Sequence, residues 1–261
     1  MKVVLITGGS SGIGRAAARL FHERGWRVYE LSRRESSEAG ITHLTSDVTD
    51  RESVRRVVET VWKSEGRIDL LVNNAGMGIS GPVEFASGED VRRQFDVNFF
   101  GALAVTQEVI PLMRKQKGGT ILFVTSVASP VAIPFQAFYS ASKAALQSLS
   151  DSLRNELAPF GIRVSSILPG DTHTGFTDAR VKNGAGEGIY GRAFTKSVSS
   201  MEKDERNGMT PESAARVIFR AGNAKNPRVW YTVGTGYKLL VFLERILPAR
   251  LVRWIVGKLY A

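Results

Sequence analysis

The sequence predicts an α/β fold in which a doubly wound parallel sheet, built as a single domain, is followed by a C-terminal helical extension. Short apolar runs of strand length alternate along the chain with amphipathic segments of helix length. This alternation is typical of a parallel sheet wound by right-handed crossovers. The 261 residues, 43% of them hydrophobic, are enough for one large core, and no linker-like stretch divides them. We expect residues 1–236 to form the domain and residues 237–261 the extension.

The composition excludes several kinds of site. The chain contains no cysteine, and its histidines (His22, His43 and His173) are widely scattered, so the sequence predicts no metal centre. A net charge of +10 is compatible with nucleic acid, a membrane surface or an anionic ligand. The cations are nevertheless dispersed over many predicted helices, without the interleaved aromatic residues of a basic patch, which argues against a nucleic-acid partner.

The first residues run directly into a predicted strand, without the longer apolar region and the cleavage site of a signal peptide. No stretch approaches the roughly 18 apolar residues of a membrane-spanning helix. The sequence therefore predicts a cytoplasmic protein.

A glycine-rich turn joins the first predicted strand, Val3 to Ile6, to a helical segment, Arg15 to Arg24. Glycines let the backbone approach a ligand closely, and the free N–H groups of a helix N-terminus favour an anion. The turn therefore predicts the phosphate cradle of a Rossmann-like fold, a tight turn without a ligand being the alternative. The residues predicted to bind cofactor here are Gly8, Ser10, Ser11, Gly12, Ile13, Gly14 and Arg15.

The second predicted strand, Arg27 to Leu31, ends at Ser32 and Arg33. In a dinucleotide-binding fold an acidic residue at this point binds the adenosine ribose, whereas an arginine accommodates a 2′-phosphate. Ser32 takes the acidic position here and Arg33 follows it, while Arg15 adds a second charge. The electrostatics favour NADP(H), and solvated arginines in a loop are the alternative.

The third and fourth predicted strands also end in polar or small residues. Leu44 to Val48 ends a strand, where Asp47 is placed for a polar contact to adenine. After the helix from Asp50 to Ser64, the buried run Ile68 to Val72 leads into a turn of small and amide residues. Such residues line a cofactor or brace neighbouring strands. The residues predicted to bind cofactor here are Asp47, Val48, Asn74, Ala75 and Gly76.

Residues 89–114 are predicted to form one long helix that contains Asn98. Asparagine is unfavourable inside a helix, so Asn98 is either an ordinary exposed residue or a polar group used for a bend or a bound water. The fifth predicted strand, Thr120 to Val124, delivers Ser126 at its carboxyl end, where ligands of open α/β sheets bind.

A predicted helix over residues 136–158 places Tyr139 and Lys143 one turn apart on one face. A phenol titrates near about 10, and a neighbouring cation would lower that pKa toward neutral pH and make the phenol a usable acid/base group. The Ser126 hydroxyl would then hold the oxygen of a reacting carbonyl or alcohol. The alternative is a helix with one exposed lysine and one half-buried tyrosine.

The sixth predicted strand, Ile162 to Leu168, ends in a segment that should close over the nicotinamide side of the cofactor. Residues 175–209, rich in glycine and charge, predict a mobile substrate lid, with a solvated loop as the alternative. A helix is expected over Pro211 to Ala221. The residues predicted to bind cofactor here are Pro169, Gly170, Thr172 and Thr174, and the predicted substrate contacts are Phe176, Ile189, Tyr190 and Phe194.

The extension, residues 237–261, carries an apolar stripe with flanking cations, and Pro248 should divide it into two short helices. Three roles remain open for this amphipathic segment. It would lie on an anionic membrane surface, cover the substrate cleft, or pack against a second subunit.

The motifs described above occur in the order found in one known family. They are Thr7-Gly8-x3-Gly12-x-Gly14, Asp47, Asn73-Asn74-Ala75-Gly76, Asn98, Ser126, Tyr139-x3-Lys143 and Pro169-Gly170 with Thr174. Over nearly all of residues 1–235 the chain resembles the short-chain dehydrogenase/reductase family. The resemblance implies that Tyr139 is the general acid/base and that Ser126 orients the substrate oxygen. It also implies that Lys143 binds the nicotinamide ribose and lowers the Tyr139 pKa, and that Asn98 holds a water in a proton relay.

The resemblance further implies NADPH-dependent reduction of a ketone or aldehyde to an alcohol, because a cofactor with a 2′-phosphate is usually kept reduced in cells. The long C-terminal tail and the Arg33 region look like the hydroxysteroid and retinol dehydrogenase branch, so we expect a lipophilic, steroid-, retinoid- or lipid-like substrate. A homodimer or homotetramer is expected. An NAD(H)-preferring alcohol dehydrogenase and a non-catalytic dinucleotide sensor are the alternatives.

Overall fold

The computed structural model describes residues 1–260, residue 187 by its backbone alone. Its centre is a parallel sheet of seven strands in the order β3-β2-β1-β4-β6-β7-β9, and a separate pair, β5 and β8, lies outside it. The strands are β1 (Val3–Thr7), β2 (Arg27–Ser32), β3 (Ile41–Thr45), β4 (Leu70–Asn73), β5 (Ile79–Ser80), β6 (Gly119–Val124), β7 (Ile162–Pro169), β8 (Val181–Lys182) and β9 (Trp230–Val233). The predicted doubly wound α/β fold is confirmed.

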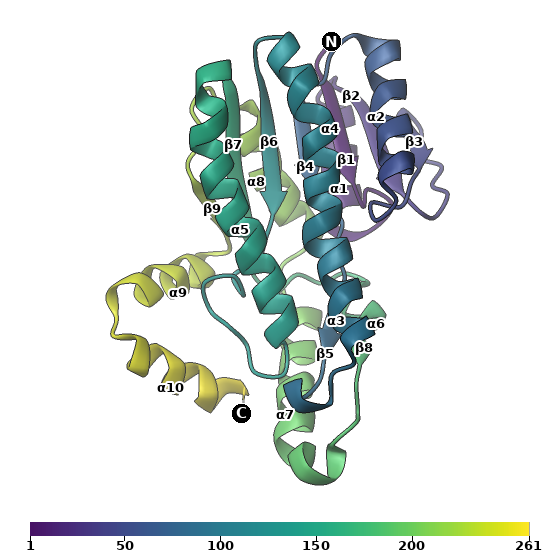
Figure 1. Cartoon of the computed structure of the whole chain (residues 1–261). Helices are drawn as coiled ribbons and strands as arrows, with labels where there is room; N and C mark the ends of the chain where they lie inside the picture. Colours follow the sequence, from purple (N-terminus) through teal and green to yellow (C-terminus); the bar gives the residue numbers. More distant parts are fainter. Residues whose placement is uncertain (261) are drawn as a thin grey trace.

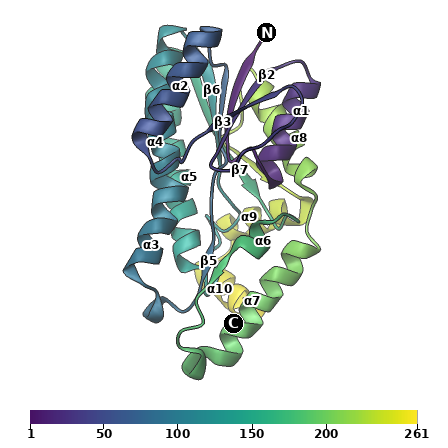
Figure 2. The same cartoon turned by 90° about the vertical axis from the view of Figure 1, so that its right-hand side faces the viewer.

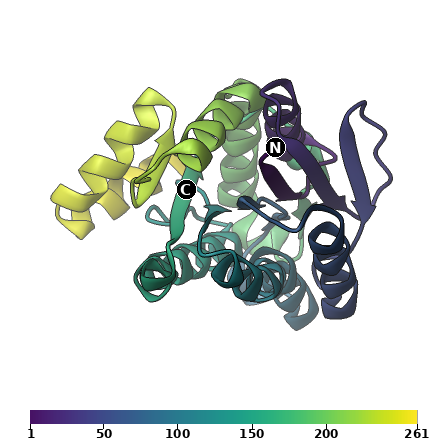
Figure 3. The ribbon, with the colours of Figure 1, turned by 90° about the horizontal axis from the view of Figure 1, so that it is seen from above.

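Helices cover both faces of the sheet, as Figures 2 and 3 show. The helices are α1 (Gly12–Glu23), α2 (Arg51–Glu65), α3 (Gly88–Phe95), α4 (Gly101–Lys115), α5 (Ala137–Leu157), α6 (Phe176–Ala179), α7 (Glu187–Arg206), α8 (Pro211–Asn223), α9 (Thr235–Ile246) and α10 (Ala249–Tyr260). Helices α2, α4 and α5 pack on one face, and α1 and α8 on the other. None of the helices in the described part of the chain is long and apolar enough to cross a membrane.

Two hydrophobic cores hold these layers together, one on each face. The strands contribute alternate residues to the two cores: Leu5 and Leu71 face α2 and α4, whereas Val4 and Leu70 face α1 and α8. This is the period of two expected of a strand. Because both faces are covered, β1 is fully buried, which explains its continuous apolar run.

The segments that do not belong to the sheet layers gather beyond the carboxyl ends of the strands. In Figure 1, α3, α6, α7 and the β5–β8 pair lie below the sheet, and α9 and α10 extend to one side of it. The carboxyl edge of a parallel sheet is where α/β proteins bind their ligands. The fold therefore places the variable part of the chain next to the predicted site.

The long helix predicted over residues 89–114 is confirmed, and it contains one π-helical turn. Helix α3 ends at Phe95, a π-helical turn follows over Asp96–Phe100, and α4 begins at Gly101. Asn98 lies in the π-turn and is fully buried. Asn98 is therefore not the ordinary exposed residue of the first alternative, but a buried polar group in a π-turn.

Residues 175–209 are not the solvated loop considered above, because most of them are helical. Most of its glycines lie around the start of α7 (Gly184, Gly186, Gly188 and Gly191), and the N-cap residue Gly186 has a left-handed backbone conformation. Beyond them Phe194, Val198 and Met201 recur at helical spacing and are buried together. This apolar stripe is a helix signal that the glycine content of the segment obscured.

The predicted division of the C-terminal extension is confirmed. Helix α9 ends at Ile246, α10 begins at Ala249, and Pro248 lies between them. The inner faces of the two helices bury Val241, Val252 and Val256.

Candidate active site

The glycine-rich turn between β1 and α1 has the geometry of a phosphate cradle. Gly12 has a φ of 52°, and a Cβ added at Gly14 would lie 2.3 Å from the Gly8 carbonyl oxygen, so neither position accepts a larger residue without distortion. The side chain of the N-cap residue, Ser11, accepts no hydrogen bond from the first turn of α1. The N–H groups of that turn therefore stay available for an anion. The turn fits a dinucleotide pyrophosphate.

Asn74 holds the cradle against the end of β4. Its side-chain amide donates to the carbonyl oxygens of Thr7 and Gly8 at 3.0 and 3.2 Å, and the Thr7 hydroxyl accepts from the backbone N–H groups of Asn74 and Ala75. The sequence left two roles open for this turn, lining a cofactor or bracing neighbouring strands, and these hydrogen bonds show that it braces β1 against β4. The exposed Gly76 beside it remains a predicted cofactor contact.

The end of β2 carries the arginine predicted to recognise a 2′-phosphate. Arg33 is 77% exposed, and its nearest charged partner is Asp47 at 3.9 Å. Arg15 is instead engaged, because its Nε donates to the Glu38 carboxylate at 2.7 Å. Arg19 binds the same carboxylate and is the main cause of the lowered pKa of Glu38. Of the two predicted cations, Arg33 is the one more free to meet an anion.

Asp47 and Val48 lie at the turn between β3 and α2. Asp47 accepts hydrogen bonds from the backbone and the hydroxyl of Thr49 at 2.9 and 2.8 Å. Val48 is buried, and a Cβ placed on Gly101 would lie 2.6 Å from its side chain. Both residues therefore shape the turn, and their contact to adenine stays a prediction.

A buried carboxylate missed in the sequence analysis, that of Glu30, lies on β2 close to the end that carries Ser32 and Arg33. Glu30 is 1% exposed, contacts His43, and accepts from the Ser32 hydroxyl at 3.3 Å. A Cβ added at Gly9 would lie 2.5 Å from the Glu30 side chain. A charged residue in the middle of a buried strand was the signal available in the sequence.

The predicted catalytic residues meet at the carboxyl end of β6. Tyr139 and Lys143 lie on α5, and the Lys143 ammonium is 5.9 Å from the centre of the Tyr139 ring. Lys143 is buried and donates to the Val124 carbonyl at 2.9 Å. Ser126 follows β6, forms a hydrogen bond that lowers the Tyr139 pKa, and accepts from the Ala128 N–H at 3.0 Å. The structure thus brings together a phenol, a hydroxyl and an ammonium.

The Tyr139 pKa shifts in the direction opposite to the one predicted. Burial raises it to about 12, which outweighs the lowering by Ser126 and by the charge of Arg180. Burial also lowers the pKa of Lys143 to about 8. The prediction of a lowered phenol pKa counted the cation and omitted the cost of placing a phenolate away from water.

Asn98 joins three segments next to this group. Its side-chain oxygen accepts from the Met77 N–H at 2.8 Å, and its side-chain nitrogen donates to the Met77 carbonyl and the Ser142 hydroxyl at 3.0 and 3.1 Å. A Cβ added at Gly76 would lie 3.3 Å from Asn98 and 3.4 Å from the Lys143 ammonium. Asn98 is therefore close to Lys143, and its side chain fixes the loop after β4.

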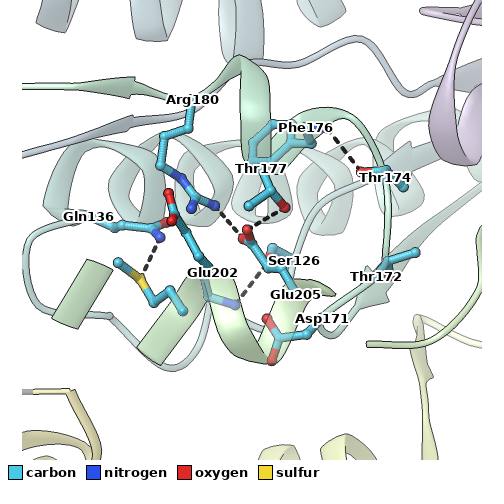
Figure 4. Close-up of polar contacts among 12 residues, drawn as sticks. Ser126, Gln136, Asp171, Thr172, Thr174, Phe176, Thr177, Arg180, Glu202 and Glu205 are labelled. Carbon is cyan, nitrogen blue, oxygen red and sulfur yellow. Dashed lines mark hydrogen bonds and ion pairs between the residues drawn. The ribbon is translucent and has the colours of Figure 1, made fainter. Parts of the chain in front are cut away.

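The segment after β7 lies against the phosphate cradle, and its closure over the nicotinamide side remains a prediction. A Cβ added at Gly12 would lie 3.3 Å from the Thr174 side chain. Thr174 also accepts from the Phe176 N–H at 3.2 Å (Figure 4). Thr172 donates to the Gly170 carbonyl at 2.9 Å. The ring of Phe176 then lies 5.8 Å from that of Tyr139, which places one predicted substrate contact at the predicted catalytic phenol.

The other predicted substrate contacts are distributed differently. Phe194 is buried in the cluster with Val198 and Met201, and Tyr190 donates to Glu84 at 3.0 Å. Ile189 is 72% exposed. These residues shape α7 and its neighbours, and Phe176 is the one found against Tyr139.

Comparison with known proteins assigns the chain to a family of dinucleotide-binding enzymes, in agreement with the glycine cradle described above. The sequence model of the short chain dehydrogenase family matches residues 2–185. The chain belongs to this family. It is an oxidoreductase of the kind that acts on carbonyl and hydroxyl groups and binds a nicotinamide dinucleotide.

Two curated relatives are reductases. The chain is 39% identical over 264 residues to a 3-ketodihydrosphingosine reductase of Bacteroides thetaiotaomicron, covering 100% of this chain and 98% of that protein. It is 43% identical over 180 residues to an NADPH-dependent 1-acyldihydroxyacetone phosphate reductase of Schizosaccharomyces pombe, covering 66% of this chain and 60% of that protein. Among solved structures, a short-chain dehydrogenase from Streptomyces avermitilis matches with a TM-score of 0.82 and 30% identity, over 97% of this chain and 95% of that one.

Proposed function

We propose that the chain is an NADPH-dependent reductase that converts the ketone of a lipophilic substrate into an alcohol. The observation that carries this proposal is the meeting of Tyr139, Ser126 and Lys143 at the carboxyl end of β6, next to a glycine cradle. NADPH supplies a hydride to the carbonyl carbon when it is bound. The side chains of the protein hold the oxygen of the substrate ketone and donate the proton that completes the alcohol.

Tyr139 is the proton donor in this proposal. Its pKa of about 12 keeps the phenol protonated at neutral pH, which is the form that reduction requires. Ser126 donates to the carbonyl oxygen and keeps it within reach of the phenol. As negative charge develops on the oxygen and then on Tyr139, the Lys143 ammonium stabilises it from one helical turn away. Asn98 supports the loop beside Lys143 and holds the water of a proton relay.

The end of β2 supports NADPH over NADH. Ser32 leaves the strand end without an exposed carboxylate, and Arg33 presents an exposed guanidinium that would bind a 2′-phosphate. Glu38 would compete with that phosphate for Arg15. The relative from Schizosaccharomyces pombe is named as NADPH-dependent, which agrees with this assignment.

The substrate class follows from the segment around Phe176 and from the relatives. The Phe176 ring, next to Tyr139, gives the substrate side an apolar contact. Both curated relatives described above are named for long-chain or acylated keto compounds. We therefore propose a long-chain keto lipid in preference to a steroid or a retinoid.

The test is NADPH oxidation by the purified protein with a panel of hydrophobic ketones. Turnover of a long-chain ketone that is lost in Tyr139→Phe supports the proposed reductase. Binding of NADPH without turnover of any ketone would instead support a non-catalytic dinucleotide sensor. Equal turnover with NADPH and NADH would contradict the cofactor assignment.

A further inference from the structure

A group of polar side chains lies on the substrate side of Tyr139 and has no part in the chemistry described above. It consists of Asp171, Arg180, Glu205 and Tyr237, and we call it the head-group cluster. Asp171 follows β7, Arg180 lies between α6 and β8, Glu205 is at the end of α7, and Tyr237 is at the start of α9. The charges of Glu205, Arg180 and Asp171 all act on the Tyr139 pKa. Through the Phe176 ring, which lies 5.6 Å from the Arg180 guanidinium and 5.8 Å from the Tyr139 ring, the cluster borders the phenol and is within reach of a substrate held there.

Arg180 has hydrogen-bonding capacity that the protein does not use. Its side chain is 1% exposed and pairs with Glu205 (Figure 4). Among the described residues neither its Nε nor its Nη1 has a hydrogen-bond partner. The Phe176 ring lies between it and the catalytic residue, 5.6 Å from the guanidinium and 5.8 Å from the Tyr139 ring. Buried guanidinium donors normally have acceptors, so these donors indicate an oxygen atom of a ligand.

The charges of the cluster do not balance. Glu205 neutralises Arg180, and the Thr177 hydroxyl donates to the other Glu205 oxygen at 2.7 Å. Asp171 is bound by the Tyr237 hydroxyl and, in the part of the chain that the structure describes, forms no ion pair. Burial, with the nearby Glu205, raises the pKa of Asp171. One negative charge without a counterion therefore remains beside the reacting position, where a cation would be favoured.

We propose that the head-group cluster binds the polar head of a lipid amino ketone. Asp171 pairs with an ammonium group next to the reacting carbonyl, and Arg180 donates to an oxygen of the same head. A phosphate head is disfavoured, because Glu205 already neutralises Arg180 and Asp171 would repel the anion. The proposal rests on the proposed ketone reductase and names its substrate class.

The experiment compares ketones of one chain length in the presence of NADPH. The probes are a long-chain 2-amino-1-hydroxy-3-ketone, its N-acetyl derivative, and the 1-hydroxy-3-ketone without nitrogen. The wild-type KM should be at least about tenfold lower for the free amine than for the other two. Asp171→Asn should abolish this difference, so that the free amine loses its KM advantage over the nitrogen-free ketone. Asp178→Asn, at an exposed aspartate that pairs with Arg206, is the matched control and should keep the preference.

The same experiment separates the two proposals. Wild-type protein that reduces all three ketones with equal KM overturns the head-group proposal and leaves the reductase standing. Wild-type protein that reduces none of them overturns both. Arg180→Met should raise KM for the hydroxy ketones but not for a 3-ketone without the hydroxyl group. Equal losses on both kinds of ketone, with a lowered unfolding temperature, would show that Arg180 serves only the fold.

A second, independent observation concerns the outward faces of α9 and α10. These faces expose large apolar side chains: Leu239, Phe242, Ile246, Leu251, Trp254 and Leu259, each 42–60% exposed. The inward faces meanwhile pack near the substrate side, where Val252 and Val256 bury Val131. The tail therefore covers part of that side and also presents an apolar surface of its own.

The charge around this outward surface is strongly positive. Exposed cations surround it (Lys238, Arg245, Arg250, Arg253 and Lys258), whereas the acid of the two helices is Glu244. Apolar side chains with flanking cations are typical of helices that lie in the interface of an anionic bilayer. We infer that this face docks on an anionic lipid surface, which would bring the substrate side to the bilayer that holds a lipid ketone.

Co-sedimentation with vesicles tests this docking. The protein should sediment with phosphatidylcholine vesicles that contain phosphatidylglycerol, and should do so at least about tenfold less with phosphatidylcholine alone. The double variant Phe242→Ser/Trp254→Ser should lose this binding, while Val83→Ser, an exposed apolar position elsewhere, should keep it. If the wild type binds no vesicles and the double variant instead halves the mass in solution, the face contacts a second copy and the inference is overturned. Ketone reduction by the double variant in detergent should match that of the wild type, because detergent presents the substrate without a bilayer.

Discussion

The nucleotide side and the substrate side of this molecule are built in different ways. On the nucleotide side, the contacts that shape the site are made largely by the backbone: the Gly8 and Val124 carbonyls accept from Asn74 and Lys143, and α1 offers its first N–H groups. On the substrate side, ion pairs and packed rings connect segments far apart in the chain, such as Arg180 with Glu205. The first kind of site depends on local motifs, and the second depends on how distant segments pack.

The largest effect is expected where the two sides meet. Tyr139→Phe removes the proposed proton donor and should lower kcat for ketone reduction by about a hundredfold to ten-thousandfold. NADPH affinity, measured by fluorescence titration, should stay within about twofold, because the cradle is untouched. A variant that keeps wild-type turnover would show that another group protonates the oxygen.

On the nucleotide side, Arg33→Ala should raise KM for NADPH by at least about tenfold and leave KM for NADH unchanged, because the lost contact is to the 2′-phosphate. The chemical step should be little affected, since that phosphate is remote from the hydride. Arg34→Ala, at the neighbouring loop arginine, is the matched control. Steady-state kinetics with both cofactors decide whether Arg33 discriminates between them.

The pH dependence tests the link between Lys143 and the phenol. The lowered pKa of Lys143, about 8, means that its charge is present below that pH and lost above it, while Tyr139 stays protonated to about 12. Reduction should therefore slow above pH 8, by about tenfold per pH unit once Lys143 is neutral. Lys143→Arg should remove this descending limb from the pH–rate profile. A wild-type profile that stays flat to pH 10 would contradict the role of the charge.

The smallest catalytic effect is expected deep in the substrate side. Phe194→Ala removes a ring that packs on Phe135 and should destabilise α7 by about 3 kcal/mol. Hydrogen exchange in α7 should rise far more than in β1 or β6, and KM for NADPH should stay within about twofold. Equal loss of protection in both regions would show that the two sides unfold as one unit.

The sequence by itself determined the sheet, its helices and most of the nucleotide side. These features rest on local patterns: apolar runs between helical segments, a glycine turn, and residues one helical turn apart on α5. The family assignment follows from the same motifs and is confirmed, whereas the cofactor choice and the roles of individual residues remain predictions. The homodimer or homotetramer expected from the sequence also remains a prediction.

Only the tertiary structure decided the features that depend on burial and on distant contacts. It showed that the Tyr139 pKa is raised by burial, an effect that spacing along a helix does not report. It placed Asn98 in a π-turn bonded to Met77, and it turned a glycine-rich segment into α7. It also brought Arg180 and Glu205 together near Tyr139. Desolvation and long-range pairing arise when segments pack, so a local reading of the chain does not predict them.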